Sequence, residues 1–293
     1  GILSTGRDGE PFDAFTGASK PRIYASQGIH FATTEQSLTV CEAQIESCEG
    51  LDYTTSMGKV IIARVAKPGA IEVAGPVSVD QCLDVIKRLR EKYKVDTILI
   101  DGSINRMAIT TSRLKAGVIL ATGAALGDME YVIRQTQLKV TMMQTRCVNA
   151  KIKELLTENA GKGSALLIDR NLSVTTLPAS LLHNVKDIAK AIADNAKYLY
   201  TDGAVSDLLI EHLLEKGKSL EIIVEDASKI YVTEQEYKKW MSCGGHLTVK
   251  NKVNLLAVTC NPYNPTGQGF EPKRFLKTMR SRLNVPVYDV MMN

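Results

Sequence analysis

The sequence lacks the features that mark several protein classes. None of its six cysteines form a C-x-x-C pair, which speaks against a zinc knuckle and a disulfide framework. The longest apolar stretch, residues 116–126, is interrupted by glycine and threonine and is far shorter than the roughly 20 residues that span a bilayer. No signal peptide is recognisable either. We therefore expect a cytoplasmic protein with no membrane partner.

A block of basic residues is also missing. The net charge of +4 is spread along the 293 residues. The densest basic run, residues 273–282, places its charges at helical spacing. This spacing predicts a solvated helix face rather than a surface for phosphate backbones, so we expect no nucleic-acid partner.

Hydrophobic periodicity alternates between helix and strand along much of the chain. Apolar residues recur at helical spacing after Ser78, which is placed to cap a helix, and residues 95–101 and 117–121 read as buried strands before a helix over 128–143. The second half predicts strands at 165–168, 198–201, 221–224, 255–260 and 285–287, and helices at 185–194, 205–216, 233–242 and 272–283. The pattern predicts an α/β protein with mainly parallel sheets and flanking helices.

Two α/β units account for this pattern. The first is predicted to cover residues 1–158 and to carry a β-rich insertion at about residues 20–76. In that insertion, residues 23–25 and 29–32 flank Gln27-Gly28 and are expected to form a hairpin. A stretch of small residues begins the second unit, residues 159–293.

Four of the predicted strands end in an acidic residue or an acidic turn. If these strands are parallel, each acid points into the crevice where α/β proteins bind ligands. The strand that ends at Asp101 has the form of a Walker B strand, whose acid holds Mg²⁺ directly or through water. A helix cap or turn is the competing interpretation of Asp101 and of the other acids, Asp169, Asp202 and Glu225.

The loop over residues 4–10 reads Ser-Thr-Gly-Arg-Asp-Gly-Glu. Gly6 and Gly9 would allow the backbone to approach a ligand closely, and Asp8 would join Asp101 at a hydrated metal ion. The competing interpretation is a surface turn in which Asp8 bonds its own backbone.

A complete P-loop, G-x-x-x-x-G-K-[ST], is not found in this sequence. The nearest match, residues 161–164, lacks the leading glycine and the final hydroxyl residue, and we interpret it as an ordinary loop. Because Gly1 reads as the interior of a strand, we expect about 30 or more residues with a P-loop to precede it.

Residues 261–267 match the Asn-Pro-x-Asn-Pro-Thr-Gly motif of fold-type-I aminotransferases, and Asp289 stands about where their pyridine-binding aspartate would be. That chemistry requires a lysine further along the chain to form the Schiff base, and no lysine follows Asp289. The simpler interpretation of residues 261–267 is a loop with two prolines that connects a strand to the next helix.

Four short motifs together resemble the KamB-type family encoded beside lysine 5,6-aminomutase. They are Ser-Thr-Gly-Arg-Asp-Gly-Glu at 4–10, Ile-Asp-Gly-Ser-Ile-Asn-Arg at 100–106, Leu-Ala-Thr-Gly-Ala-Ala-Leu at 120–126 and Val-Thr-Cys-Asn-Pro-Tyr at 258–263. The resemblance implies a subunit of a nucleotide-dependent reactivase, which acts with a MutS-like ATPase partner to release damaged cobalamin from an adenosylcobalamin-dependent aminomutase.

The same resemblance implies an incomplete P-loop-like fold for residues 1–158 and ATP or GTP with Mg²⁺ as cofactor, provided that the upstream P-loop is present. Carried over by position, Arg7, Asp8 and Asp101 would surround the Mg²⁺–phosphate end of the site, and Gly6 and Gly9 would shape the loop. A P-loop ligase or kinase of the dethiobiotin-synthetase type is the alternative function, and a pyridoxal-phosphate enzyme is the less favoured one.

Overall fold

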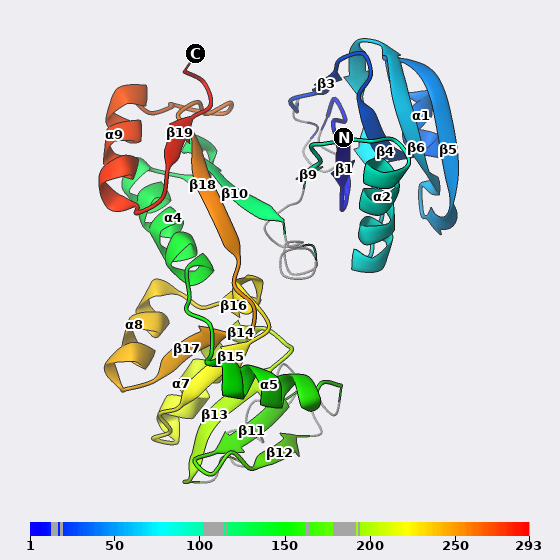
Figure 1. The fold of residues 1–293 in the computed structure, drawn as a ribbon. Helices are drawn as coiled ribbons and strands as arrows, with labels where there is room; N and C mark the ends of the chain where they lie inside the picture. Colours follow the sequence, from blue (N-terminus) through cyan, green and yellow to red (C-terminus); the bar gives the residue numbers. More distant parts are fainter. Residues whose placement is uncertain are drawn as a thin grey trace. The chain divides into compact units, whose positions relative to one another are not determined.

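The computed structural model of the chain describes residues 1–12, 17, 20–101, 114, 116–161, 165–177, 192 and 194–292. The chain divides into two compact units, Gly1–Leu114 and Lys115–Asn293 (Figure 1). Both units contain helices and strands, so the predicted mixed α/β content is confirmed. The prediction of mainly parallel sheets is only partly met, because antiparallel pairs occur in both units. None of the described helices is long and apolar enough to cross a membrane.

A five-stranded sheet forms the centre of unit 1. Its strands lie in the order β5-β6-β4-β1-β9. The strand β1 runs parallel to β4 and β9, whereas β6 is antiparallel to β4 and to β5. The bounds are β1 Ile2–Ser4, β4 His30–Thr34, β5 Gln44–Thr55, β6 Gly58–Lys67 and β9 Leu99–Asp101.

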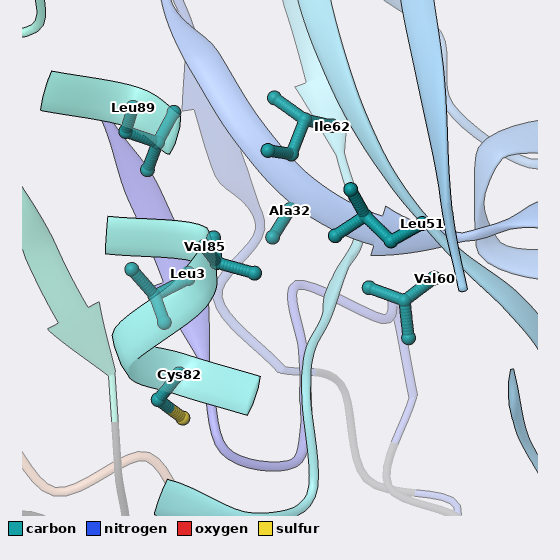
Figure 2. Packing of buried hydrophobic residues seen from close by; sticks show 8 residues of the cluster. All are labelled: Leu3, Ala32, Leu51, Val60, Ile62, Cys82, Val85 and Leu89. Atoms are coloured by element: carbon teal, nitrogen blue, oxygen red, sulfur yellow. The ribbon is translucent and has the colours of Figure 1, made fainter. Parts of the chain in front are cut away.

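Side chains alternate between the two faces of this sheet and build two hydrophobic cores. One face packs against α2 (Val79–Glu91), whose buried residues Cys82, Val85 and Leu89 meet Leu3 of β1 (Figure 2). The opposite face contributes Phe31 and Ala63 to a second cluster with Ile71 and Val73 and their neighbours. Buried side chains therefore lie on both faces of the sheet at its central strands.

Short strands and one helix complete unit 1. β2 (Arg7–Asp8) pairs with β8 (Val73–Ala74), and β3 (Ile23–Ala25) pairs with β7 (Gly69–Ile71), in both cases antiparallel. α1 (Glu35–Thr39) follows β4. The β-rich character predicted for residues 20–76 is confirmed, but the predicted hairpin is wrong. β3 and β4 flank the turn at Gly28 and then pair with different strands, because β4 is needed between β1 and β6.

Unit 2 contains a parallel three-stranded sheet, whose first strand lies at the start of the unit and whose other two lie near the end of the chain. β10 (Gly117–Gly123) pairs with β18 (Asn254–Asn261), which pairs with β19 (Val287–Asp289). The helices α4 (Met129–Met143) and α9 (Pro272–Arg282) contact these strands and each other, and the 3₁₀ helix η2 (Ala124–Leu126) joins β10 to α4. β10 and α4 thus pack with strands and a helix from the end of the chain, and the division into compact units lies earlier than the expected domain boundary at residue 158.

A second five-stranded sheet, β12-β11-β13-β15-β17, completes unit 2. β13, β15 and β17 are parallel, whereas β11 is antiparallel to both of its neighbours. The strands are β11 Ala165–Asp169, β12 Val174–Leu177, β13 Ala196–Thr201, β15 Glu221–Val224 and β17 His246–Val249. The other elements are α5 Ala150–Glu158, β14 Val205–Ser206, α7 Asp207–Glu215, η3 Ala227–Lys229, β16 Ile230–Tyr231, paired with β14, and α8 Glu234–Ser242.

Several local predictions are confirmed by these elements. Ser78 caps α2, with its hydroxyl accepting a hydrogen bond from the Gln81 amide, and the basic run of α9 is exposed while Phe275 and Met279 are buried. Cys82 is fully buried, and burial raises the pKa of its thiol to about 11. The helix predicted at 185–194 lies almost entirely outside the described residues.

The core of unit 1 gives a stability prediction. Leu3 is fully buried, whereas Leu99 on the neighbouring strand is 62% exposed. We expect Leu3→Ala to lower the free energy of unfolding of unit 1 by about 2–5 kcal/mol, because it leaves a cavity under α2. Leu99→Ala is the matched control and should cost less than about 1 kcal/mol. Hydrogen exchange during urea unfolding distinguishes the two units; equal losses for both variants would contradict this assignment of the core.

Candidate functional site

The turn between β1 and β2 is held by a serine and an aspartate. The Ser4 hydroxyl donates to Asp8 Oδ2 at 2.5 Å and accepts a hydrogen bond from the Gly6 amide at 3.1 Å. The Gly6 carbonyl in turn accepts from the Gly75 amide at 3.0 Å. These bonds fix the Asp8 carboxylate beside the carboxyl end of β1.

Asp101 ends the strand next to β1. The two strands are parallel with Ser4 opposite Asp101, and the Thr5 amide donates to the Asp101 carbonyl at 3.2 Å. Carboxyl ends of parallel strands meet at one edge of a sheet, so Asp8 and Asp101 both lie at this edge, as the sequence predicted. The Asp101 residue is exposed, whereas Ser4 is fully buried.

Thr5 adds a third oxygen group to this edge. The residue is 8% exposed, and within the described part of the chain its buried hydroxyl oxygen has no hydrogen-bond partner. Burying a hydroxyl without a hydrogen-bond partner lowers the stability of the fold by about 1–3 kcal/mol. A ligand that forms a hydrogen bond with this hydroxyl would recover that free energy on binding. Sequence patterns alone do not single out Thr5, because a threonine after a short strand has no distinctive spacing.

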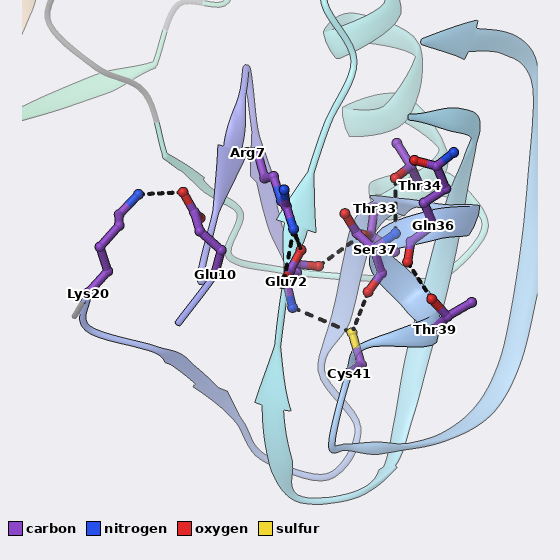
Figure 3. Close-up of polar contacts among 10 residues, drawn as sticks. All are labelled: Arg7, Glu10, Lys20, Thr33, Thr34, Gln36, Ser37, Thr39, Cys41 and Glu72. Atoms are coloured by element: carbon purple, nitrogen blue, oxygen red, sulfur yellow. Dashed lines mark hydrogen bonds and ion pairs between the residues drawn. The ribbon is translucent and has the colours of Figure 1, made fainter. Parts of the chain in front are cut away.

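The resemblance implied that Arg7 lies at the Mg²⁺–phosphate end of the site, whereas the structure shows its side chain paired with Glu72. Its Nε donates to Glu72 Oε2 at 3.0 Å and its Nη2 donates to Glu72 Oε1 at 3.2 Å, a two-pronged ion pair (Figure 3). Glu72 is 2% exposed, and its own backbone is held by the Thr33 hydroxyl and the Cys41 sulfur. In this structure Arg7 therefore anchors the loop, and a contact to phosphate stays a prediction.

The two glycines of the loop also have structural explanations. Gly9 has φ +88°, and a Cβ there would lie 2.5 Å from the Ile71 carbonyl oxygen. Close approach to β7 thus requires glycine at this position, whether or not a ligand binds. Gly6 uses its amide and carbonyl to tie the turn to Ser4 and Gly75.

Glu10 ends the loop beside Lys20, whose Nζ donates to Glu10 Oε1 at 2.5 Å. Burial disfavours the charged form of Glu10, but the hydrogen bond from Lys20 and the charges of Lys20 and Arg7 outweigh it. The pKa of Glu10 consequently lies below its ordinary value. Glu10 stays ionised together with Lys20 and fixes the end of the loop.

Two of the other acids at strand ends, Asp169 and Glu225, have internal partners. Because β11 is antiparallel to β13, Asp169 lies at the opposite edge from Asp202 and Glu225, and its Oδ1 accepts from the Asn171 and Ser173 amides at 2.8 and 2.9 Å. Glu225 accepts from the Tyr200 hydroxyl at 2.9 Å; burial and this carboxylate raise the Tyr200 pKa above its ordinary value. The turn interpretation of Asp169 is therefore confirmed.

The motif at 261–267 leaves the end of β18. Asn261 Oδ1 accepts from the Tyr263 amide at 2.9 Å, and Asp289 Oδ1 accepts from the Met291 amide at 2.8 Å. Both side chains thus form local turns. Residues 102–106 of the resemblance and 162–164 of the loop that resembles a P-loop lie outside the described residues.

A hydrated metal ion is the chemistry that this edge of unit 1 could support. Mg²⁺ binds oxygen ligands and usually keeps several waters, with one or two carboxylates and the phosphates of a substrate completing its shell. Asp8, Asp101 and Thr5 supply such oxygens. The described residues contain no group of three or more His, Cys, Asp or Glu side chains that could hold a metal ion.

Comparisons with protein-family models, curated proteins and solved structures found no match to this chain. The resemblance to the KamB-type family stays a prediction from its short motifs.

The ion pair of the buried Glu72 with the half-exposed Arg7 gives a second stability prediction. Arg7→Met would leave the Glu72 carboxylate without its cation, which we expect to cost about 1–3 kcal/mol, because solvent screens the exposed side of the pair. Glu72→Gln should cost about 1 kcal/mol, because the amide oxygen can still accept from the guanidinium. Arg22→Met, at the more exposed Arg22–Glu42 pair, is the control and should cost less than about 1 kcal/mol. Denaturant titrations of the three variants test this order; a reversed order would remove the anchoring role of Arg7.

Proposed function

We propose that this chain is a subunit of a nucleotide-dependent reactivase, with the metal end of its nucleotide site at the carboxyl edge of β1 and β9. The observation that supports it best is the parallel register that places Asp101 opposite Ser4, whose hydroxyl holds Asp8. Two acids distant in the sequence are thereby brought to one strand edge, the position at which α/β proteins bind ligands.

The chemistry of this edge fits a metal–phosphate group better than it fits a bare phosphate. Two carboxylates alone would repel a nucleotide, whereas Mg²⁺ between them and the phosphates removes that repulsion. A P-loop of the kind that the resemblance implies would supply the backbone amides that cradle the phosphates. Asp8 and Asp101 would then position the hydrated Mg²⁺, and the buried Thr5 hydroxyl would bind a ligand oxygen or a water of the metal shell.

The function at the level of the cell would be that of a chaperone in the cytoplasm. The partners are a MutS-like ATPase subunit and an adenosylcobalamin-dependent aminomutase that holds a damaged cofactor. A nucleotide-driven partner can open the inactive enzyme only if its affinity differs between the closed and the open enzyme. Nucleotide exchange or hydrolysis at the proposed site would supply that difference.

The acids provide the direct test. Asp8→Asn and Asp101→Asn each remove one negative charge while keeping size, and the amide oxygen introduced by Asp8→Asn can still accept from the Ser4 hydroxyl. We expect nucleotide-dependent reactivation of an inactivated lysine 5,6-aminomutase, with the MutS-like partner present, to fall at least about tenfold, with little change in thermal stability.

Asp96→Asn is the matched control, because Asp96 is exposed and lies shortly before β9. Full reactivation by both acid variants would show that Asp8 and Asp101 only shape the turn. Phosphoryl transfer to a small molecule by this chain without partners would instead favour the ligase or kinase.

Thr5 allows stability and function to be separated. Thr5→Val keeps the shape of the side chain and removes a buried hydroxyl that lacks a partner within the described residues. We expect the free energy of unfolding to rise by up to about 1 kcal/mol, because an unsatisfied polar group is removed. Reactivation should nevertheless fall. A variant that loses stability would show that the hydroxyl is bonded within the folded chain.

A further inference from the structure

A cavity in unit 2 opens at the amino ends of the parallel strands β13, β15 and β17. Its volume is about 440 Å³, within the range of small-molecule sites. A second cavity of about 280 Å³ adjoins it and shares Ala196, Ser219 and Leu220. The larger cavity is lined by Arg170, Ala196, Lys197, Ser219, Leu220, Glu221, Gly244 and His246.

Positive charge dominates this lining. Arg170, Lys197 and His246 contribute cationic or ionisable nitrogens, and no carboxylate of the described residues forms an ion pair with any of them. The acid in the lining, Glu221, lies 3.7 Å from the Arg146 guanidinium. Asp194 of the adjoining cavity is likewise paired, at 2.6 Å from the Lys218 ammonium. The cavity therefore has an excess of cations that its own acids do not balance.

The walls that carry these cations are fixed by the fold. The antiparallel strand β11 ends with Asp169 opposite Ala196, and the Arg170 amide donates to the Asn195 carbonyl at 3.2 Å. Arg170 is thereby held beside the first residues of β13. Lys197 follows on β13, with its ammonium 5.2 Å from the centre of the Tyr198 ring.

His246 is held on the other side by the buried Trp240 of α8. The indole Nε1 donates to the His246 carbonyl at 3.2 Å, and the His246 amide donates to the Leu220 carbonyl at 3.1 Å. A Cβ on the preceding residue, Gly245, would lie 2.2 Å from the indole, so the ring packs directly on that backbone. The backbone at His246 is consequently held between Trp240 and Leu220.

We propose that this cavity binds a phosphorylated small molecule, with Arg170 and Lys197 contacting phosphate oxygens and His246 contributing a further nitrogen donor. A guanidinium matches the tetrahedral oxygens of phosphate in two-pronged fashion, and an ammonium adds a point charge. A dianionic phosphate balances the excess positive charge, which a neutral metabolite would not do. The site belongs to unit 2 and is independent of the nucleotide site proposed in unit 1.

Inorganic pyrophosphate is the probe, titrated calorimetrically into the full chain without Mg²⁺ and at physiological ionic strength. We expect a dissociation constant of about 1 mM or tighter for the unmodified chain. Arg170→Gln and Lys197→Gln should each weaken binding about tenfold, which corresponds to the loss of one charge-assisted contact. Their thermal unfolding should be unchanged, because both side chains lie at the surface.

Lys153→Gln on α5 is the matched control, since Lys153 is an exposed cation of the same unit outside the cavity. Unchanged binding by Lys153→Gln and by Asp8→Asn would support a local site in unit 2. Equal weakening by Lys153→Gln and Lys197→Gln would show a general effect of net charge and overturn the proposal. Absence of binding by the unmodified chain at about 10 mM pyrophosphate would also overturn it.

Discussion

The hydrogen bonding of β1 to both β4 and β9 is the constraint on which unit 1 depends. β1 is three residues long, yet it joins the antiparallel strands β4, β5 and β6 to β9. Leu3 at its centre is buried under α2. Its carboxyl end is covered so closely that a Cβ on Gly75 would lie 1.6 Å from the Ser4 carbonyl oxygen. A change in β1 would therefore disturb the sheet, the core and the candidate site together.

In the loop after β1, one residue anchors the backbone and the next one faces the candidate site, because side chains alternate along the short strand β2. Arg7 and Asp8 are successive residues of β2, so their side chains leave on opposite sides. Arg7 pairs with the buried Glu72, whereas Asp8 meets the Ser4 hydroxyl at the strand end. The ion pair offsets the cost of burying Glu72 and fixes the backbone, which leaves the neighbouring carboxylate at the edge where Asp101 ends.

Sequence patterns predicted elements well where a local signal sets the boundary. Ser78 caps its helix as its position suggested, and β15 has the predicted bounds. Pairing was predicted less well, because the partner of a strand depends on residues far away in the chain. The turn at Gly28 resembles a hairpin turn, but β3 pairs with β7, and the strand ending at Asp169 gives no local sign that it runs antiparallel.

The same limit applies to the candidate site. The sequence singled out Asp8 and Asp101, whereas Glu72 as the partner of Arg7 follows only from the pairing of β2 with β8.

In unit 2 the acids that follow β15 have partners within the chain. Glu225 accepts from Tyr200 and from the Asn251 side chain, and Asp226 accepts from Ser228. A ligand there would have to displace bonds that the chain already makes, which lowers any gain in binding. At the amino edge the cations of the cavity meet no carboxylate of the described residues, so an anionic ligand would replace water rather than protein contacts. In unit 1 it is the carboxyl edge that holds the Thr5 hydroxyl, which has no partner among the described residues, and the proposed site lies there. Both proposed sites thus depend on polar or charged groups that have no hydrogen-bond or ion-pair partner within the described chain, and the direction of the strands determines which of these groups lie at one edge.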